Sequence, residues 1–90
     1  MVKTMKIYDF EGKNNISGER IRELRNKKHW SQEQLSAKMQ LAGVGIGRDS
    51  VNRLERGKRV IPDYEIRALA EIFDVSPAWL LGMESFIVEA

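Results

Sequence analysis

The chain has 90 residues, with 15 lysines and arginines against 13 aspartates and glutamates, and it contains no cysteine. A chain of this length forms one small hydrophobic core, so we expect no second, ligand-sensing domain. The lack of cysteine excludes disulfide bonds and cysteine-ligated zinc, and a single histidine cannot build a histidine-rich metal site. No apolar run is long enough to cross a bilayer, and the first residues lack the pattern of a secretory leader, so we expect a cytoplasmic protein.

The chain opens with a segment that shows little helical periodicity. Residues 1–16 contain a brief apolar and polar alternation that ends at Phe10, followed by turn-forming residues, and we interpret them as an N-terminal arm. Helix signals begin directly after this arm. Ser17 is a candidate N-cap and Glu19 lies in the first turn, so the pattern predicts a first helix over residues 18–28.

The next two helices are separated by a glycine-rich connector. Ser31 and Gln34 have the spacing of a capping box, which predicts a second helix over residues 32–41. Three glycines fall within residues 43–47 and break the helical pattern there. We expect a third, short helix from Arg48 to about Arg56.

Glycine and proline residues mark the expected helix boundaries in the rest of the chain. Gly57 stands where a left-handed residue ends the third helix. Apolar residues after Pro62 recur at the spacing of one helix face and predict a fourth helix; they are Ile66, Leu69, Ala70 and Phe73. Ser76 and Pro77 form an N-cap followed by proline, and Gly82 follows shortly after, which predicts a very short fifth helix.

A basic segment covers the expected third helix and the loop after it. Residues 48–59 have a net charge of +3, whereas the rest of the chain has a net charge of −1. On a helix that begins near Arg48, residues 49, 52 and 53 share one face, opposite Val51 and Leu54, which must face the core. Two capped helices joined by a glycine-containing turn and followed by a basic loop have the layout of a helix-turn-helix. A solvated charged face is the alternative interpretation of this segment.

Three segments carry a family resemblance: ERIRELRNKKHWSQEQLSAKM, SVNRLERGKR and DVSPAWLLG. Together they resemble the lambda-repressor and Cro type of helix-turn-helix domain, the XRE family of small regulators, across residues 17–82. The resemblance implies an all-α fold, a five-helix lambda-repressor-like DNA-binding domain with short non-helical N- and C-terminal tails. It also implies a homodimer that binds double-stranded operator DNA, with the helix-turn-helix at about residues 31–56 and the third helix in the major groove.

The resemblance assigns roles to individual positions. Gln32 corresponds to a glutamine that touches the DNA backbone and supports the third helix, and Arg25 and Glu55 correspond to an ion pair between the first and third helices. The positions that would read bases are Arg48, Asp49, Ser50, Asn52 and Arg53. The positions that would bind phosphate at the exit of the third helix are Arg56, Lys58 and Arg59.

Two positions depart from the family's pattern. Where the family commonly has an alanine and a turn-opening glycine, this chain has Ser36 and Gln40, and about five extra residues follow through Gly47. These departures predict a longer second helix and a looser turn. A looser turn would alter the angle of the third helix and the register of its base contacts.

Other conspicuous residues have structural explanations. Trp30 and Trp79 lie at helix-packing positions, where burial explains them better than base stacking. We interpret His29 as a solvent-facing or backbone-capping residue between the first two helices and not as a metal ligand. The glycines within residues 43–47 follow no strand and miss the nucleotide-binding spacing, and no pair of carboxylates separates an acid from a base. We therefore expect no enzymatic activity, no cofactor and no metal.

The sequence favours a sequence-specific DNA-binding transcriptional regulator. We expect a repressor and not an activator, because a bare DNA-binding domain can block polymerase without any added surface. The alternative is a protein-interaction module, such as an antitoxin-like partner with secondary DNA binding. This alternative depends on apolar residues of the arm and of the C-terminal tail, residues 83–90, which are candidates to hold a protein partner or to pair with each other: Ile7, Tyr8, Phe10, Phe86, Ile87 and Val88.

Overall fold

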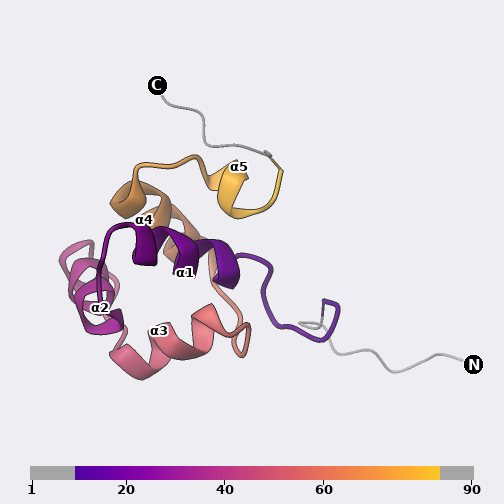
Figure 1. The fold of residues 1–90 in the computed structure, drawn as a ribbon, viewed down its shortest axis with the longest axis horizontal. Coiled ribbons are helices and arrows are strands. Elements are labelled where there is room, and N and C mark those ends of the chain that lie inside the picture. The colour runs from indigo at the N-terminus through magenta and orange to yellow at the C-terminus, as the bar shows by residue number, and fades with distance from the viewer. Residues whose placement is uncertain (1–9, 84–90) are drawn as a thin grey trace, which may run out of the picture.

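The computed structural model describes residues 10–83, and five helices account for most of them (Figure 1). In chain order they are α1 (Gly18–Lys27), α2 (Gln32–Leu41), α3 (Arg48–Glu55), α4 (Asp63–Phe73) and α5 (Pro77–Leu80). Within the described residues the only β-type pairing is an isolated bridge between Phe10 and Lys13. The predicted all-α fold with five helices is confirmed, and α1, α2 and α3 begin and end within one residue of their expected positions.

One hydrophobic core joins all five helices. Each helix contributes the apolar residues that its own periodicity places on one side, and α3 packs against both α1 and α2. Full burial of an aliphatic side chain stabilises a fold by about 1.5 to 3 kcal/mol, so this core is the main source of stability. The side chains with no exposed surface are Ile21, Leu35, Met39, Val51, Leu54, Leu69 and Leu80.

The capping box at the start of α2 is confirmed. The Ser31 hydroxyl accepts a hydrogen bond from the Gln34 backbone at 3.0 Å, and the Gln34 side chain accepts one from the Ser31 backbone at 2.7 Å. Gly57, which follows α3, has a φ of +71°, the left-handed conformation that the sequence predicts.

The predicted N-cap role of the Ser17 side chain is wrong. The Ser17 hydroxyl donates to the carbonyl oxygen of Leu80 at 2.6 Å and so ties the start of α1 to α5. The Asn15 side chain accepts the hydrogen bond from the Gly18 backbone instead, at 2.9 Å. Because Ser17 already has a helical backbone conformation, Asn15, two residues before it, is better placed to bring a side-chain acceptor to the helix end.

Both tryptophans pack within the fold, as predicted. Trp79 is buried in the core, and the half-buried Trp30 stacks on Phe73 with 5.4 Å between the ring centroids. The Lys38 ammonium lies 4.3 Å from the centroid of the Trp30 ring, so the outer face of this indole makes a cation–π contact. The exposed His29 has a φ of +59° at the joint between α1 and α2.

The apolar residues of the two termini fall almost entirely outside the described residues. Among those on which the protein-interaction alternative depends, Phe10 alone is described, and this residue is 57% exposed. A pairing of residues 7–10 with residues 86–88, which the sequence left open as an alternative, involves residues outside the described range. Between residues 10 and 83, no helix has the length and apolar content needed to span a membrane.

Candidate nucleic-acid interface

The α3 helix presents two different faces, as its sequence predicts. Val51 and Leu54 are buried in the core. Asp49 and Arg53 are exposed on the opposite side, and Asn52 is half-buried beside them. Arg48, the first residue of α3, is also exposed. The helix therefore offers a polar face that starts at its N-terminus.

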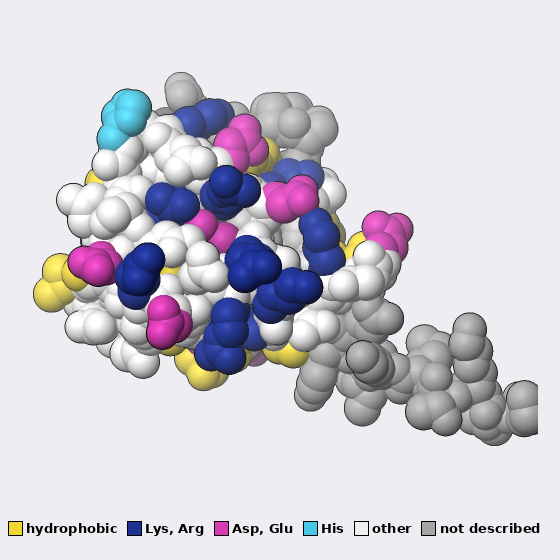
Figure 2. All heavy atoms as spheres, turned by 60° about the horizontal axis from the view of Figure 1, so that its bottom comes forward, with side chains coloured by type: hydrophobic (Ala, Val, Ile, Leu, Met, Phe, Trp, Pro, Cys, Tyr) yellow, Lys and Arg dark blue, Asp and Glu magenta, His cyan; other side chains and the backbone are white. Residues whose placement is uncertain are grey.

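Basic side chains gather on the surface that includes α3. Figure 2 views the molecule from the side on which α3 lies in Figure 1, and it shows Lys and Arg side chains clustered near the centre of that surface. Within residues 48–59 the exposed charges are those of Arg48, Asp49, Arg53, Arg56 and Lys58. The Glu55 carboxylate is paired with the Arg25 guanidinium, so its negative charge is offset and subtracts little from the positive potential of this surface.

Arg59 was expected to bind phosphate, but its side chain is directed into the fold. Its guanidinium forms an ion pair with the buried Glu65 carboxylate of α4 at 2.8 Å, and the two side chains are only 15% and 6% exposed. The same guanidinium donates to the carbonyl oxygens of Ser50 and Val60, at 3.0 and 2.9 Å. Its remaining nitrogen, Nη2, is buried. This placement argues against the expected phosphate contact, because the charged group lies inside the fold and joins α3 to α4.

Arg25 and Glu55 form a bidentate ion pair between α1 and α3. Arg25 Nε donates to Glu55 Oε2 at 2.6 Å, and Arg25 Nη2 donates to Glu55 Oε1 at 2.9 Å. The Arg25 side chain is 12% exposed and the Glu55 side chain 2%. The hydrogen bonds that Arg25 donates to Glu55 raise the pKa of Arg25, so the guanidinium stays protonated. Arg25 Nη1 also donates to the Trp30 carbonyl oxygen at 2.7 Å and fixes the joint between α1 and α2.

Gln32 extends this ion pair toward the polar face of α3. Its amide nitrogen donates to Glu55 Oε1 at 3.1 Å. Its amide oxygen accepts a hydrogen bond from the Asn52 amide nitrogen at 3.4 Å. The structure thus brings together Arg25, Gln32, Asn52 and Glu55, four of the residues that the sequence singled out. It links them in one hydrogen-bonded chain that ends on the exposed face of α3.

The turn between α2 and α3 is held by the two residues that depart from the family's pattern. The Ser36 hydroxyl and the Gln40 amide both donate to the Ile46 carbonyl oxygen, at 2.6 and 3.4 Å. Val44 and Ile46 pack against the core, and the Val44 backbone donates to the Met39 carbonyl oxygen at 2.9 Å. The expected looseness of this turn is wrong, because side chains of α2 anchor the added residues. The α2 helix ends at Leu41, within the range that the sequence predicts.

The arm contributes two asparagines that sequence reasoning missed. The Asn15 amide donates to the carbonyl oxygens of Leu54 and Arg59, at 3.0 and 2.8 Å. The Asn14 backbone and amide donate to Gly57 and Lys58, at 2.9 and 3.2 Å. The arm therefore holds the backbone around the exit of α3, where Lys58 presents its charge. Two successive asparagines before a helix were the available signal, since this residue type bonds backbone groups outside regular structure.

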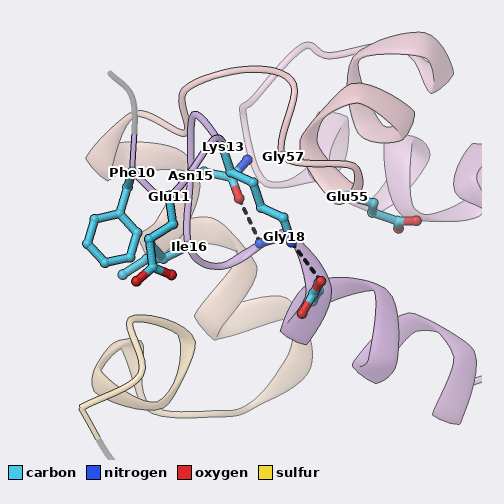
Figure 3. Close-up of a pocket in the computed structure, with 9 residues that line it drawn as sticks. Phe10, Glu11, Lys13, Asn15, Ile16, Gly18, Glu55 and Gly57 are labelled. Atoms are coloured by element: carbon cyan, nitrogen blue, oxygen red, sulfur yellow. Dashed lines mark hydrogen bonds and ion pairs between the residues drawn. The ribbon is translucent and has the colours of Figure 1, made fainter. Parts of the chain in front are cut away.

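A hollow of about 230 Å³ lies between the arm and the start of α1 (Figure 3). Lys13 reaches across it and its ammonium donates to the Glu19 carboxylate at 2.7 Å. Gly18 lies beside this hollow, and a Cβ at this position would come within 2.3 Å of the Leu54 carbonyl oxygen. Only glycine permits this close approach between the start of α1 and the end of α3.

Residues 21–80 match the family model described as Helix-turn-helix, HTH_3. The chain belongs to this family. The match spans the buried core, the Arg25 and Glu55 pair and the basic surface of α3, so the geometry and the family agree on the same region. As an XRE-type helix-turn-helix protein, the chain is a DNA-binding transcriptional regulator.

One solved structure gives a closer comparison. The restriction-modification controller protein C.AhdI from Aeromonas hydrophila is 40% identical to this chain, with a TM-score of 0.57. The alignment covers 70% of this chain and 84% of the C.AhdI chain. No curated protein is significantly similar to the chain.

Proposed function

We propose that this regulator is a repressor that binds a specific double-stranded operator as a homodimer, with α3 in the major groove. The carrying observation is the polar face of α3, which is exposed, basic and held from behind by the buried Arg25 and Glu55 pair. A helix in this arrangement can enter the major groove with its N-terminal residues toward the base edges. The extra turn residues before α3 are anchored to α2, which supports a stable docking angle.

The side chains on this face of α3 can form hydrogen bonds with different bases. Arg48 and Arg53 have the fork of donors that fits guanine O6 and N7, and Asn52 has the donor and acceptor pair that fits adenine. The Asp49 carboxylate can accept a hydrogen bond from cytosine N4. The Ser50 hydroxyl can donate or accept and so suits more than one base. These five positions form the proposed base-reading set.

A second set of residues is proposed to bind phosphates without reading sequence. Gln32 lies at the N-terminus of α2, and Arg56 and Lys58 are exposed at the exit of α3. Contacts of this kind set register and orientation on the duplex. Arg59, by contrast, is proposed to support the surface by holding α3 against α4 and not to touch DNA.

The direction of regulation and the regulated genes are part of the proposal. A small DNA-binding domain can repress a promoter simply by occupying it and blocking polymerase. Activation would need an additional surface that contacts polymerase, so repression is the proposed direction. The likeness to the C.AhdI controller supports restriction-modification genes as the regulated class.

The proposal is tested by selecting binding sites from a random duplex pool with the wild-type chain and with Asn52→Ala and Arg53→Ala. The wild type should recover an inverted repeat whose half-sites are about 34 Å, one helical turn, or a multiple of it apart. Each variant should lose preference at one or two base pairs per half-site, by about 1 to 3 kcal/mol for each lost contact, while non-specific affinity is kept. Arg67→Ala, an exposed change on α4, is the matched control.

Variants that recover the wild-type motif unaltered would place the reading surface elsewhere. Recovery of a single half-site without an inverted repeat would reject the homodimer. A reporter fused to the promoter that carries the selected site should be more active when the regulator is deleted, and lower activity would reject repression.

A further inference from the structure

Lys13 belongs to the arm, and its side chain lies against the exit of α3. The family resemblance covers residues 17–82 and so assigns no role to this lysine. We propose that Lys13 binds a phosphate of the DNA backbone, and that its ammonium leaves the Glu19 carboxylate to do so. The inference rests on the proposed function, because it takes the exit of α3 as a part of the molecule that faces DNA.

The stem of Lys13 packs on Gly57. A Cβ at Gly57 would lie 3.1 Å from Lys13 Cδ and 3.2 Å from its Cβ and Cγ. Glycine has no Cβ, so the lysine stem can lie directly over the backbone at this point. Arg56 and Lys58, which flank Gly57 in the chain, are exposed and are the residues proposed to bind phosphate there. Lys13 thus brings a third cation to the same short stretch of backbone.

Hydrogen bonds fix the backbone of Lys13. It exchanges two of them with Phe10, at 2.6 and 3.0 Å, in a tight turn whose central residues, Glu11 and Gly12, have φ values of +52° and +82°. The next residue, Asn14, donates from its backbone and its side chain to carbonyl oxygens at the exit of α3. The base of the lysine stem is therefore placed relative to α3 before DNA arrives, and only the end of the side chain has to move.

The present partner of Lys13 holds it weakly. Lys13 Nζ lies 2.7 Å from Glu19 Oε1, and the two side chains are 48% and 80% exposed. An ion pair this exposed contributes little, because water solvates both charges well and two long side chains lose freedom. Arg59, by contrast, is paired with Glu65 inside the fold and cannot exchange its partner for a phosphate. The Lys13 ammonium can therefore change partners at small cost.

A DNA phosphate has two advantages over the Glu19 carboxylate. Duplex DNA carries condensed counterions, and a cation that neutralises a phosphate releases them into the solvent, whereas a cation on Glu19 releases none. Arg56 and Lys58 would also hold the DNA strand beside Gly57, so Lys13 would meet a phosphate at high local concentration. The exchange transfers no proton: the ammonium stays protonated, and the exposed Glu19 carboxylate is solvated by water.

The test removes the charge of Lys13 but keeps its packing and the net charge of the protein. Lys13→Gln retains the three stem carbons that lie over Gly57, and Glu19→Gln in the same molecule removes the partner charge. Affinity for the selected operator and for a random duplex is measured between about 50 and 200 mM salt. The slope of log affinity against log salt should fall in magnitude by about 0.9 for each subunit on both duplexes.

Three variants serve as controls. Arg67→Gln combined with Glu71→Gln removes another exposed ion pair, on α4, and should keep the wild-type slope. Lys13→Arg retains the cation and should also keep it. Glu19→Gln alone should keep the slope and tighten binding by no more than about fivefold, because no ion pair then has to break.

A wild-type slope in the double variant of Lys13 and Glu19 would overturn the inference. The proposed function would stand in that case if Lys58→Ala still reduced the slope. An unchanged slope in Lys58→Ala as well would show that the exit of α3 does not face DNA, and the proposed phosphate contacts would then fail together with this inference.

Discussion

The Ser36 hydroxyl donates a 2.6 Å hydrogen bond to the carbonyl oxygen of Ile46, ten positions later in the chain. Ile46 directly precedes Gly47, the N-cap of α3, so this bond fixes the backbone at the point where α3 begins. Ser36 stands where the family commonly has alanine, and the residues it holds are the ones added in this chain. The hydroxyl compensates for the longer turn by attaching it to α2.

Ser36→Ala should therefore destabilise the protein by about 1 kcal/mol, although alanine has the higher helix propensity. The net loss is expected because the Ile46 carbonyl oxygen keeps only the longer bond from Gln40, and Ser36→Ala combined with Gln40→Ala should cost more. Urea unfolding measures both free energies. The control is Ala37→Ser, which exchanges the same two residue types at an exposed neighbouring position. An equal or greater stability of Ser36→Ala would show that the hydroxyl does not hold the turn.

Glu55→Ala should be among the most destabilising single changes in the chain. Removal of one partner of a fully buried ion pair costs about 3 to 5 kcal/mol, because the other charge stays buried without compensation. Arg25 and Glu55 are nearly in this regime, with side chains 12% and 2% exposed. Glu33→Ala, at an exposed position, should cost less than about 1 kcal/mol. Thermal unfolding compares the two, and equal melting temperatures would contradict a structural role for the pair.

Lys58 and Arg59 are neighbours in sequence but should respond oppositely to substitution. Lys58→Ala should leave stability within about 0.5 kcal/mol of the wild type, because its side chain is exposed. It should also reduce the slope of log affinity against log salt by about 0.9, the effect of one lost phosphate contact. Arg59→Ala should lower the free energy of unfolding, because it leaves the Glu65 carboxylate buried and unpaired, and should keep the salt slope. A reduced slope in Arg59→Ala and an unchanged one in Lys58→Ala would reverse the assignment.

The contact between the arm and α1 should be visible in the titration of Glu19. The hydrogen bond and the charge of Lys13 lower the pKa of this carboxyl in the folded protein. A lowered folded-state pKa stabilises the fold above the unfolded-state pKa, and the contribution is lost as pH falls through the folded-state value. Lys13→Ala should raise the pKa of Glu19 toward its usual value, as followed by nuclear magnetic resonance, whereas Lys13→Arg should keep it low. An unchanged Glu19 titration in Lys13→Ala would show that the contact is absent in solution.

Features that depend on a few consecutive residues were predictable from the sequence. The capping box of Ser31 and Gln34 spans one helical turn, and both of its hydrogen bonds are present. The burial of Val51 and Leu54 opposite Arg53 follows from the period of a single helix. In each case the interacting groups are placed by local backbone geometry alone.

Features that depend on partners far along the chain required the folded structure. Ser17 looks like an N-cap locally, but its hydroxyl bonds Leu80, 63 positions away, because the packing of α5 brings that carbonyl oxygen within reach. Arg59 has the sequence context of a phosphate contact, but α4 brings Glu65 beside it and draws the guanidinium into the fold. The Asn52 amide donates to the Gln32 side chain of another helix, 20 positions earlier. A polar side chain can satisfy its hydrogen bonds with water or with any suitable partner, and the identity of that partner is decided by which helices pack together.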